Sequence, residues 1–502
     1  MSGPYFEPTF NLLQAILLLI STYSAWTFIY SKFFHPLRDF PGPWINATTR
    51  VPYWIACLRG DQVPWIQKLH ARYGPVVRFG PSDLSYIGQQ AWKDIYGHQR
   101  ERKENPRDPQ FYPPSENGAP SVADLNAEEH ATLRRLMAPA FSDRAVKEQE
   151  RMFHGFADLM VGTMQKAVVD GQGSCIDMVK TFNLTTFDIM AQLTFGESLG
   201  LLESSEYTPW VELVFKSIRL VPILQILEYY PILKFVFKIL EPKSVQRMRV
   251  THYKHSADRL HRRLERGSDE PDIWNLVSAQ DGAEESIITV PQMVSNAQLF
   301  MAAGTETTAT LLSGLTYLLL TNLRCLETLT HEIRIAFESS QQINFESLAR
   351  LPYLNACIEE GLRMYPPVPS GFPRVIPEGG NVIMGRWVPA GTSVSVHTTS
   401  TYRDPGNFKN PNQFIPDRWM GDPTYKDDKL DARQPFSVGP RSCLGMGMAW
   451  HEMRLLLSKV LIDFDLELCD ESREWMNQKV YILWQKKPLI CRAIPVSRGA
   501  AS

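Results

Sequence analysis

A ten-residue stretch near the C-terminal end constrains the fold more than any other part of the chain. Residues 436–445 read Phe-Ser-Val-Gly-Pro-Arg-Ser-Cys-Leu-Gly. Gly439 and Pro440 break regular structure, whereas residues 446–461 are typical of a helix. Cys443 therefore lies just before an expected helix N-terminus, where free N–H groups and the helix dipole stabilise a thiolate. The rest of the chain can be read as building a pocket over this cysteine.

A buried free cysteine in a glycine-rich loop is the simpler interpretation of Cys443. The spacing F-x-x-G-x-R-x-C-x-G argues against it, because five fixed positions rarely match by chance. The pattern resembles the haem-binding signature of the cytochrome P450 family. This resemblance implies that Cys443 is the axial thiolate ligand of haem iron and that Phe436 belongs to the haem-binding loop. Gly439 would allow a tight turn, Gly445 would let the backbone approach a flat ligand, and Arg441 could pair with a haem propionate.

Composition favours one large domain. The length of 502 residues suggests about three domains, but no linker, repeat or low-complexity tract divides the chain. Lys and Arg total 52 and Asp and Glu total 54, so the formal net charge of −2 gives no case for a nucleic-acid partner. The seven cysteines show neither a disulfide framework nor C-x-x-C spacing, which suits a reducing compartment.

Residues 12–30 are mostly apolar and uncharged, and they are just long enough to span a bilayer. A cleaved signal peptide is the alternative, but no basic segment precedes the stretch and aromatic residues stand where a cleavage site should be. Basic residues follow it, which places the body in the cytosol. We expect a transmembrane anchor over residues 12–30, a proline-rich hinge over 31–44 and a catalytic domain over 45–502. The resemblance implies a single-pass protein of the endoplasmic reticulum membrane.

A second pattern lies in a long helix expected over residues 289–321, which begins with a capping box. Residues 303–308 read Ala-Gly-Thr-Glu-Thr-Thr. Threonines can also bond their own backbone and bend a helix, and that explanation stays open for the residues alone. The stretch resembles the A-G-x-[DE]-T pattern of the family. By this resemblance Gly304 leaves room for dioxygen, and Thr307 and Glu306 deliver protons during its activation.

Glu360 and Arg363 stand three residues apart on another expected helix. Such pairs are usually worth little. The resemblance to the E-x-x-R pattern of the family adds a buried partner, Arg418. It assigns the three residues to folding and haem retention rather than to chemistry.

His130 and Arg134 share one face of a helix expected over residues 126–137. Alone, the pair would suggest a solvated face. In the family the corresponding helix contacts the haem propionates through W-x-x-x-R, with His130 here at the place of the tryptophan. The resemblance also brings Arg374 to a propionate.

The segment 209–240 is unusually apolar. It is either two packed helices or a cap that dips into a membrane and admits a lipophilic substrate. The family places further pocket residues in the irregular loop 100–122, in residues 300–303 and in residues 368–372. None of these stretches contains a readable substrate code.

The resemblance covers almost the whole chain and implies a mainly α fold with a small β region, with haem b bound between the long helix and the cysteine loop. Among its members the chain resembles fungal microsomal enzymes of secondary metabolism. Such enzymes insert one oxygen atom from O2 into a lipophilic small molecule. No nicotinamide or flavin fingerprint is visible, so electrons from NADPH would arrive through a separate membrane-bound reductase. That reductase could dock on basic residues near the cysteine, namely Arg134, Arg135, Arg144 and Lys147.

Other outcomes share the same patterns. The haem chemistry could give desaturation, ring coupling or multi-step oxidation, and the role could be detoxification of xenobiotics or aromatic acids. A family member that isomerises or dehydrates without dioxygen often lacks the acid–threonine pair, which is present here as Glu306 and Thr307. A non-enzymatic haem sensor would need neither this pair nor an apolar access region.

Overall fold

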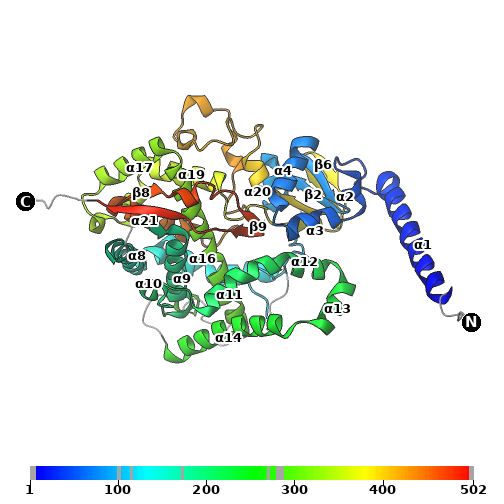
Figure 1. The fold of residues 1–502 in the computed structure, drawn as a ribbon, viewed down its shortest axis with the longest axis horizontal. Helices are drawn as coiled ribbons and strands as arrows, with labels where there is room; N and C mark the ends of the chain where they lie inside the picture. The colour runs from blue at the N-terminus through cyan, green and yellow to red at the C-terminus, as the bar shows by residue number, and fades with distance from the viewer. Residues whose placement is uncertain are drawn as a thin grey trace, which may run out of the picture.

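The computed structural model describes residues 7–98, 103–112, 117–170, 175–267, 272–278 and 288–496. Helices dominate these residues and the strands form small sheets (Figure 1). This is the mainly α fold with a small β region that the sequence predicts. Parts of the predicted pocket loop 100–122, at residues 100–102 and 113–116, lie outside the described residues.

The N-terminal part combines one long helix with short helices and a strand pair. Its elements are α1 (Glu7–Ile29), η1 (Tyr30–Phe34), α2 (Trp44–Thr48), α3 (Val51–Leu58), α4 (Gln62–Tyr73), β1 (Val76–Gly80), β2 (Asp83–Tyr86) and α5 (Gln89–Tyr96).

The middle of the chain is almost entirely helical. Its elements are α6 (Ala127–Met137), η2 (Ala138–Phe141), α7 (Asp143–Glu148), α8 (Glu150–Asp170), β3 (Cys175–Asp177), α9 (Met178–Phe195), α10 (Leu201–Ser204), α11 (Pro209–Ser217), η3 (Ile218–Leu220), α12 (Val221–Tyr229), α13 (Pro231–Leu240), α14 (Lys243–Arg266), α15 (Ile273–Ser278), α16 (Val290–Leu320), α17 (Leu323–Ala336), η4 (Ser340–Gln342), α18 (Phe345–Ala349) and α19 (Pro352–Met364).

The C-terminal part adds most of the strands and one more long helix. Its elements are β4 (Arg374–Val375), β5 (Asn381–Ile383), β6 (Arg386–Val388), β7 (Ser393–Val396), α20 (Thr398–Tyr402), η5 (Pro416–Trp419), η6 (Pro423–Tyr425), η7 (Leu430–Ala432), α21 (Met446–Asp463), β8 (Phe464–Leu468), η8 (Asp470–Ser472), β9 (Lys479–Tyr481), β10 (Leu483–Gln485) and β11 (Ile490–Pro495).

The four-stranded sheet ties the two ends of the chain together. Its strand order is β1-β2-β7-β4, with β2 and β7 parallel and the other neighbours antiparallel. Leu84, Val394 and Val396 are fully buried in the core beside it. A smaller sheet, β3-β11-β8, joins the last strand to the start of α9. Elements far apart in the sequence thus frame the helical body from two sides.

Helix α16 crosses the middle of the body and packs against α9, α14, α19 and α21. The predicted capping box is confirmed, because the Thr289 hydroxyl accepts from the Gln292 N–H and the Gln292 side chain accepts from the Thr289 N–H. The helix ends at Leu320, as expected from the sequence. Most of its residues are buried, so its polar residues lie where any polar group needs a partner.

Helix α1 coincides with the predicted anchor but begins earlier, at Glu7, and ends at Ile29. It extends away from the body (Figure 1). Among the helices of the described residues, none taken singly has the length and apolarity needed to cross a membrane. Only α16 and α17 together pass that test, with a bend of 112° between them. The transmembrane anchor over residues 12–30 therefore stays a prediction.

Candidate active site

The cysteine loop leads directly into α21, as the sequence predicts. Gly445 is the N-cap of this helix, so Cys443 lies two residues before the cap. The Cys443 N–H donates to the Phe436 carbonyl at 2.8 Å, and the Ser442 N–H donates to the Gly439 carbonyl at 3.1 Å. These two bonds close the loop on itself, and the ring of Phe436 packs against the main core.

The two glycines of the loop have different structural reasons. Gly439 has φ +78°, and a Cβ there would overlap the carbonyl oxygen of Tyr96, so no other residue fits without a shift. A Cβ on Gly445 would meet only the ring of Phe141, at 3.9 Å. The backbone at Gly445 therefore borders open space, as the predicted approach to a flat ligand requires.

The Cys443 thiol lies at an interior surface. Its side chain is accessible, although protein atoms surround it on almost every side. Burial raises the pKa of the Cys443 thiol, while the Gly445 N–H and the Arg134 guanidinium act in the opposite direction. An iron ion bound at this sulfur would reverse the balance, because a coordinating thiol is deprotonated outright.

Basic side chains gather around this loop. Arg134 donates from Nη1 to the Ser442 carbonyl at 2.7 Å, which fixes α6 to the cysteine loop. Arg441 forms an ion pair with Glu104, and Arg374 contacts the same carboxylate at 3.4 Å. Arg374 and Arg441 are both buried. One carboxylate therefore faces two buried guanidinium groups.

Arg107 and His130 also belong to this cluster. Arg107 pairs through its backbone with Arg374 and was not singled out from the sequence. Burial and then the positive charges of Arg441, Arg134, Arg107 and Arg374 together lower the pKa of His130 to about 4. His130 is therefore a neutral imidazole at pH 7.

The cluster fits the two propionates of haem. Three buried guanidinium nitrogens of this cluster have no hydrogen-bond partner among the described residues, namely Arg107 Nε, Arg374 Nε and Arg441 Nη1. Buried donors of this kind are costly to leave unpaired. Two carboxylate groups would satisfy these donors and offset the excess positive charge. Together with a thiol beside open space, this is the donor set that haem b requires.

The middle of α16 borders the same region. Ala302, Ala303 and Thr307 have accessible atoms in a helix that is buried on both sides of them. Phe141 links the helix to the cysteine loop, since its ring lies 5.3 Å from that of Phe300 and next to Gly445. An accessible stretch in the centre of a core helix indicates that α16 lines an internal space.

Thr307 and Gly304 each have a local explanation as well. The Thr307 hydroxyl donates to the Ala303 carbonyl at 2.6 Å, which is the backbone bond that the sequence left open. A Cβ on Gly304 would lie 2.6 Å from the Met190 sulfur, so this glycine is needed for close packing of α16 on α9. Room for dioxygen at Gly304 stays a prediction.

Glu306 has a partner that the sequence did not reveal. Its Oε1 lies 2.9 Å from Lys486 Nζ, and both side chains are almost fully buried. The Thr310 hydroxyl donates to the same oxygen at 3.3 Å. Lys486 comes from the segment that follows β10, far from α16 in the sequence. No spacing rule connects residues so distant along the chain.

The predicted ion cluster around Glu360 is present and has no exposed surface. Arg363 donates from Nη2 and Nε at 2.7 and 2.8 Å, and Arg418 donates from Nε at 3.2 Å. The indole of Trp419 adds a fourth donor at 2.9 Å. Burial alone would raise the pKa of Glu360, but these partners outweigh it and lower the pKa. The cluster joins α19 to η5, which precedes the cysteine loop in the sequence.

Comparison with known proteins identifies the family. Residues 51–492 match the profile of the family described as Cytochrome P450. The chain belongs to the cytochrome P450 family. It is 46% identical over 473 residues to the cytochrome P450 monooxygenase efuB of Hormonema carpetanum, with 94% of each chain covered. It is 45% identical over 466 residues to FUM2 of Gibberella moniliformis, covering 92% of this chain and 99% of that one. It is 40% identical over 477 residues to lcsI of Purpureocillium lilacinum, covering 94% and 92%.

This P450 is accordingly a haem-thiolate monooxygenase that acts on a lipophilic molecule. It uses haem b, dioxygen and electrons that a separate reductase takes from NADPH. Haem, when bound, supplies the oxygen chemistry. The chain's own side chains would hold the group: Cys443 at the iron, and Arg107, Arg374 and Arg441 at the propionates. Buried Glu306 and accessible Thr307 follow each other in α16.

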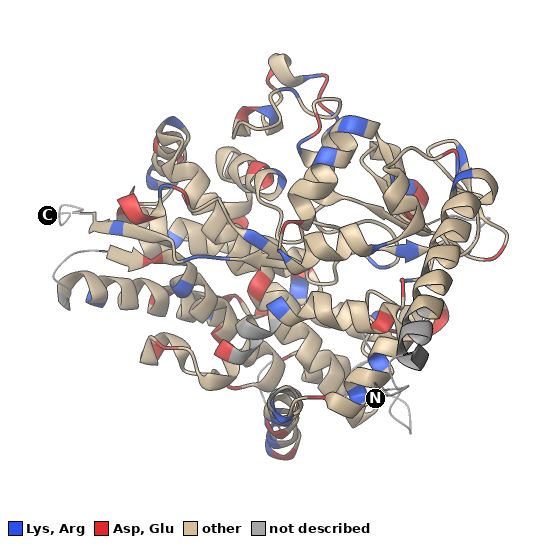
Figure 2. Ribbon diagram, turned by 45° about the vertical axis from the view of Figure 1, so that its right-hand side comes forward, with Lys and Arg blue, Asp and Glu red and all other residues tan. Residues whose placement is uncertain are grey.

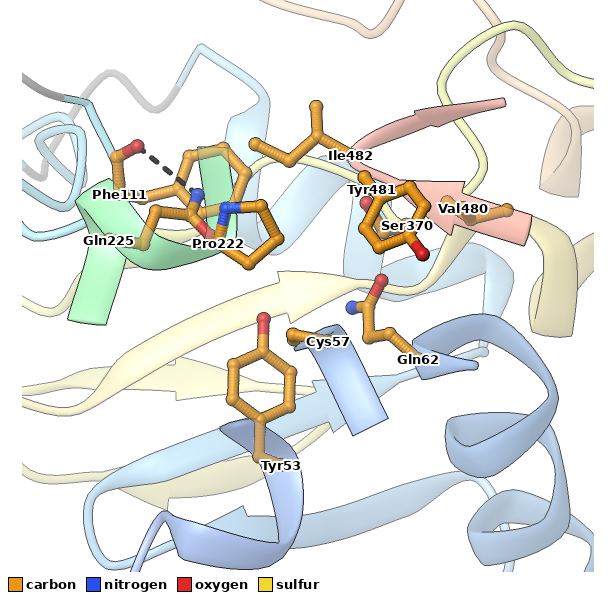
Figure 3. A pocket seen from close by; sticks show the side chains of 10 residues that line it. All are labelled: Tyr53, Cys57, Gln62, Phe111, Pro222, Gln225, Ser370, Val480, Tyr481 and Ile482. Carbon is orange, nitrogen blue, oxygen red and sulfur yellow. Dashed lines mark hydrogen bonds between the residues drawn. The ribbon is translucent and has the colours of Figure 1, made fainter. Parts of the chain in front are cut away.

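A small cavity of about 10 Å³ lies between α3, α4, α12 and the β9–β10 hairpin (Figure 3). Four of its lining residues, Phe111, Pro222, Gln225 and Ser370, come from segments predicted to form the substrate pocket. The remainder come from elements that the sequence did not suggest: α3, the start of α4 and the β9–β10 hairpin. Gln225 of α12 donates to the Phe111 carbonyl at 3.4 Å and closes the seam between the cap and the loop.

The predicted reductase-docking patch stays a prediction. Arg134 points inward to Ser442, whereas Arg144 pairs with Glu148 and Lys147 pairs with Asp143 at 2.9 Å each. These carboxylates offset two of the four proposed positive charges. Acidic and basic residues are interspersed over the body in general (Figure 2).

Proposed function

We propose that this P450 hydroxylates a lipophilic small molecule in fungal secondary metabolism. The main support is that three features lie around one interior region. They are an accessible thiol, a cluster of arginines with too few carboxylate partners, and the accessible centre of α16. The similarity to monooxygenases of several fungi agrees with this setting. Desaturation or ring coupling would use the same residues, and the product decides between them.

The test is a comparative mass-spectrometric metabolite profile of the source organism with and without this gene, grown under isotopically heavy dioxygen. If the enzyme is a hydroxylase, the strain without the gene should lose a product that contains one heavy oxygen and should accumulate a precursor that lacks this oxygen. A precursor and product that differ by two hydrogens would contradict hydroxylation and favour desaturation or coupling. No change under several growth conditions would contradict the biosynthetic role.

The roles of the individual residues belong to the same proposal. Cys443 is the axial ligand in the loop of Phe436, Gly439 and Gly445. Arg441, Arg374 and Arg107 would hold the propionates, with Arg134 and neutral His130 beside them. Glu306 and Thr307 move protons at the oxygen-binding face, where Gly304 leaves room for dioxygen. Glu360, Arg363 and Arg418 retain the fold of the haem-binding region.

Membrane attachment is the third part of the proposal, with residues 12–30 as anchor, 31–44 as hinge and 45–502 as the cytosolic catalytic domain at the endoplasmic reticulum. Large apolar side chains are exposed along α1, such as Leu19 and Trp26. Helix α13 exposes six more, namely Ile232, Leu233, Phe235, Val236, Ile239 and Leu240. Apolar surface of this extent favours a lipid neighbour. Of the two interpretations of segment 209–240, this exposure favours the membrane-dipping cap.

The end of α1 supports the same orientation. Lys32, Arg38 and Arg78 line a cavity of about 160 Å³ beside it, where lipid phosphates would lie. The test is flotation of the full chain with vesicles. We expect co-flotation with phosphatidylcholine vesicles and stronger retention when phosphatidylserine is included. Sedimentation as free protein with both compositions would contradict membrane attachment.

A further inference from the structure

We propose that Lys486 is a positioning residue that holds Glu306 in the orientation and charge state needed for proton delivery. The inference rests on the proposed role of Glu306 in that delivery. It concerns a residue outside every sequence pattern of the family that the chain displays. Its basis is the geometry of one buried polar network between α16, α9 and the segment after β10.

All three hydrogens of the Lys486 ammonium have partners. Nζ lies 2.9 Å from Glu306 Oε1, 2.8 Å from the Thr310 hydroxyl and 3.2 Å from Asn183 Oδ1. An ammonium group has three donors, so the group is saturated and cannot rotate freely. Burial lowers the pKa of Lys486, and the charge and hydrogen bond of Glu306 oppose that shift only in part.

Glu306 is held on one side only. Oε1 receives both the Lys486 ammonium and the Thr310 hydroxyl, whereas Oε2 is buried without a hydrogen-bond partner among the described residues. A carboxylate clamped at one oxygen leaves the other free to accept and pass on a proton. Thr307 follows Glu306 directly in α16 and is accessible, so one helical turn joins the buried acid to the interior region that α16 lines.

Other charged groups do not compete for Lys486. Asp177 is the other carboxyl group close enough to influence it, but Asp177 Oδ1 accepts the N–H groups of Leu489, Val179 and Lys180. Asn183 continues the network, because its Nδ2 donates to the Tyr207 hydroxyl at 3.0 Å. Burial raises the pKa of that phenol, so Tyr207 stays neutral. Lys486 is thus committed to Glu306.

The segment that bears Lys486 also connects two regions of the enzyme. It follows β10 directly, and the turn of the β9–β10 hairpin lines the cavity of Figure 3 through Tyr481 and Ile482. A structural element on the substrate side therefore reaches the acid of α16.

The test compares Lys486→Met with Lys486→Arg, with Glu306→Gln and with the double variant. Without the ammonium, a buried carboxylate takes up a proton. Infrared spectra of purified haem-loaded Lys486→Met, taken as the difference from the wild type, should show an added protonated carboxyl band, and the same difference for the double variant should lack it. Lys486→Arg should lack the band. Lys479→Met is the matched control, because Lys479 lies half-exposed in the same hairpin and pairs with Asp61.

Product formation is the second measurement, made in the gene-deletion strain complemented with each variant. We expect at least a tenfold fall in product per haem-loaded enzyme for Lys486→Met and for Glu306→Gln, with no further fall in the double variant and no change for Lys479→Met. Wild-type product from Glu306→Gln would overturn both the proposed proton role and this inference. Loss of product in Glu306→Gln, with wild-type product and no carboxyl band in Lys486→Met, would overturn this inference alone. If Lys486→Met fails to load haem, the double variant, which lacks both charges, is compared with Glu306→Gln. Equal product from these two variants would support this inference, and a further fall in the double variant would overturn it.

Discussion

The proposed role of Thr307 in proton delivery can be tested without disturbing the stability of the fold. Its hydroxyl donates only to the Ala303 carbonyl in its own helix, so its loss removes no tertiary contact. Thr307→Ala should therefore leave the melting temperature and the haem content nearly unchanged. With reductase and substrate, it should consume NADPH but yield much less product, because proton delivery is impaired.

Thr321→Ala is the matched control for this experiment. Its hydroxyl makes the same bond, to the Tyr317 carbonyl at 2.9 Å, at the far end of α16. The control should couple NADPH to product normally, and Thr307→Ser should recover most of the lost product. Wild-type coupling in Thr307→Ala would count against the proton role.

Gly439 gives a second prediction for a single residue. A side chain here would require φ +78° and would overlap the Tyr96 carbonyl. Gly439→Ala should therefore distort the cysteine loop and lower haem loading severalfold, at a cost of more than about 1 kcal/mol. Gly447→Ala, at a position where a Cβ meets nothing within 4 Å, should load haem normally. Absorbance of haem per protein checks both, and equal loading would refute the explanation.

Which residues could be found from the sequence depended on the distance between partners along the chain. Cys443, Gly439 and Arg441 share one short pattern, and the structure places them together as expected. Arg107 and Lys486 are recognised only when remote segments meet, so no local spacing could indicate them. The pairs of Arg144 and Lys147 were visible as charges four residues apart, and that signal should have lowered the charge expected of the docking patch.

At the scale of elements, the cluster that joins α19 to η5 is the feature with the largest expected effect on stability. Glu360→Ala would leave the Arg363 and Arg418 guanidinium groups buried without their carboxylate, which costs about 3–5 kcal/mol. We expect a strongly lowered melting temperature and loss of haem during purification.

The exposed pair of Glu346 and Arg350 provides the control, because both side chains are mostly solvent-accessible. Glu346→Ala should change the free energy of unfolding by less than about 1 kcal/mol. Similar melting temperatures for the two variants would show that the buried cluster does not hold α19 and η5 together.

The helices themselves were predicted unevenly. The bounds of α16 and α21 agreed with the sequence because a capping box and a glycine-rich loop mark their starts. One interpretation of the segment 209–240 was two packed helices, but it contains three helices, α11, α12 and α13. Pro209, Pro222 and Pro231 each lie in a first helical turn, which is a local signal that the hydrophobicity of the segment concealed.

At the scale of the whole molecule, buried neutral histidines make stability depend on pH. Burial lowers the pKa of His70 to about 4 and that of His397 to about 3, against about 6.5 in the unfolded chain. The unfolded state therefore binds protons first as pH falls below 6.5. Each histidine should reduce the free energy of unfolding by about 1.4 kcal/mol per pH unit until its folded pKa is reached.

Urea unfolding at pH 7 and pH 5 checks this expectation. The wild type should be clearly less stable at pH 5, and His397→Gln should lose less stability over the same interval. If the free energy of unfolding falls by the same amount between pH 7 and pH 5 in wild type and in His397→Gln, then His397 does not contribute to the pH dependence.

The proposed haem site depends on one thiolate, because the fold places the cysteine loop, the arginine cluster and α16 around Cys443. The most direct measurement is the absorption spectrum of the reduced carbon monoxide complex of wild type and Cys443→Ala, with Cys469→Ser as a control. The wild type and the control should show the red-shifted Soret band of thiolate-ligated haem, and Cys443→Ala should lack it. A thiolate-type band that persists in Cys443→Ala would contradict the placement of the haem and with it the proposed site.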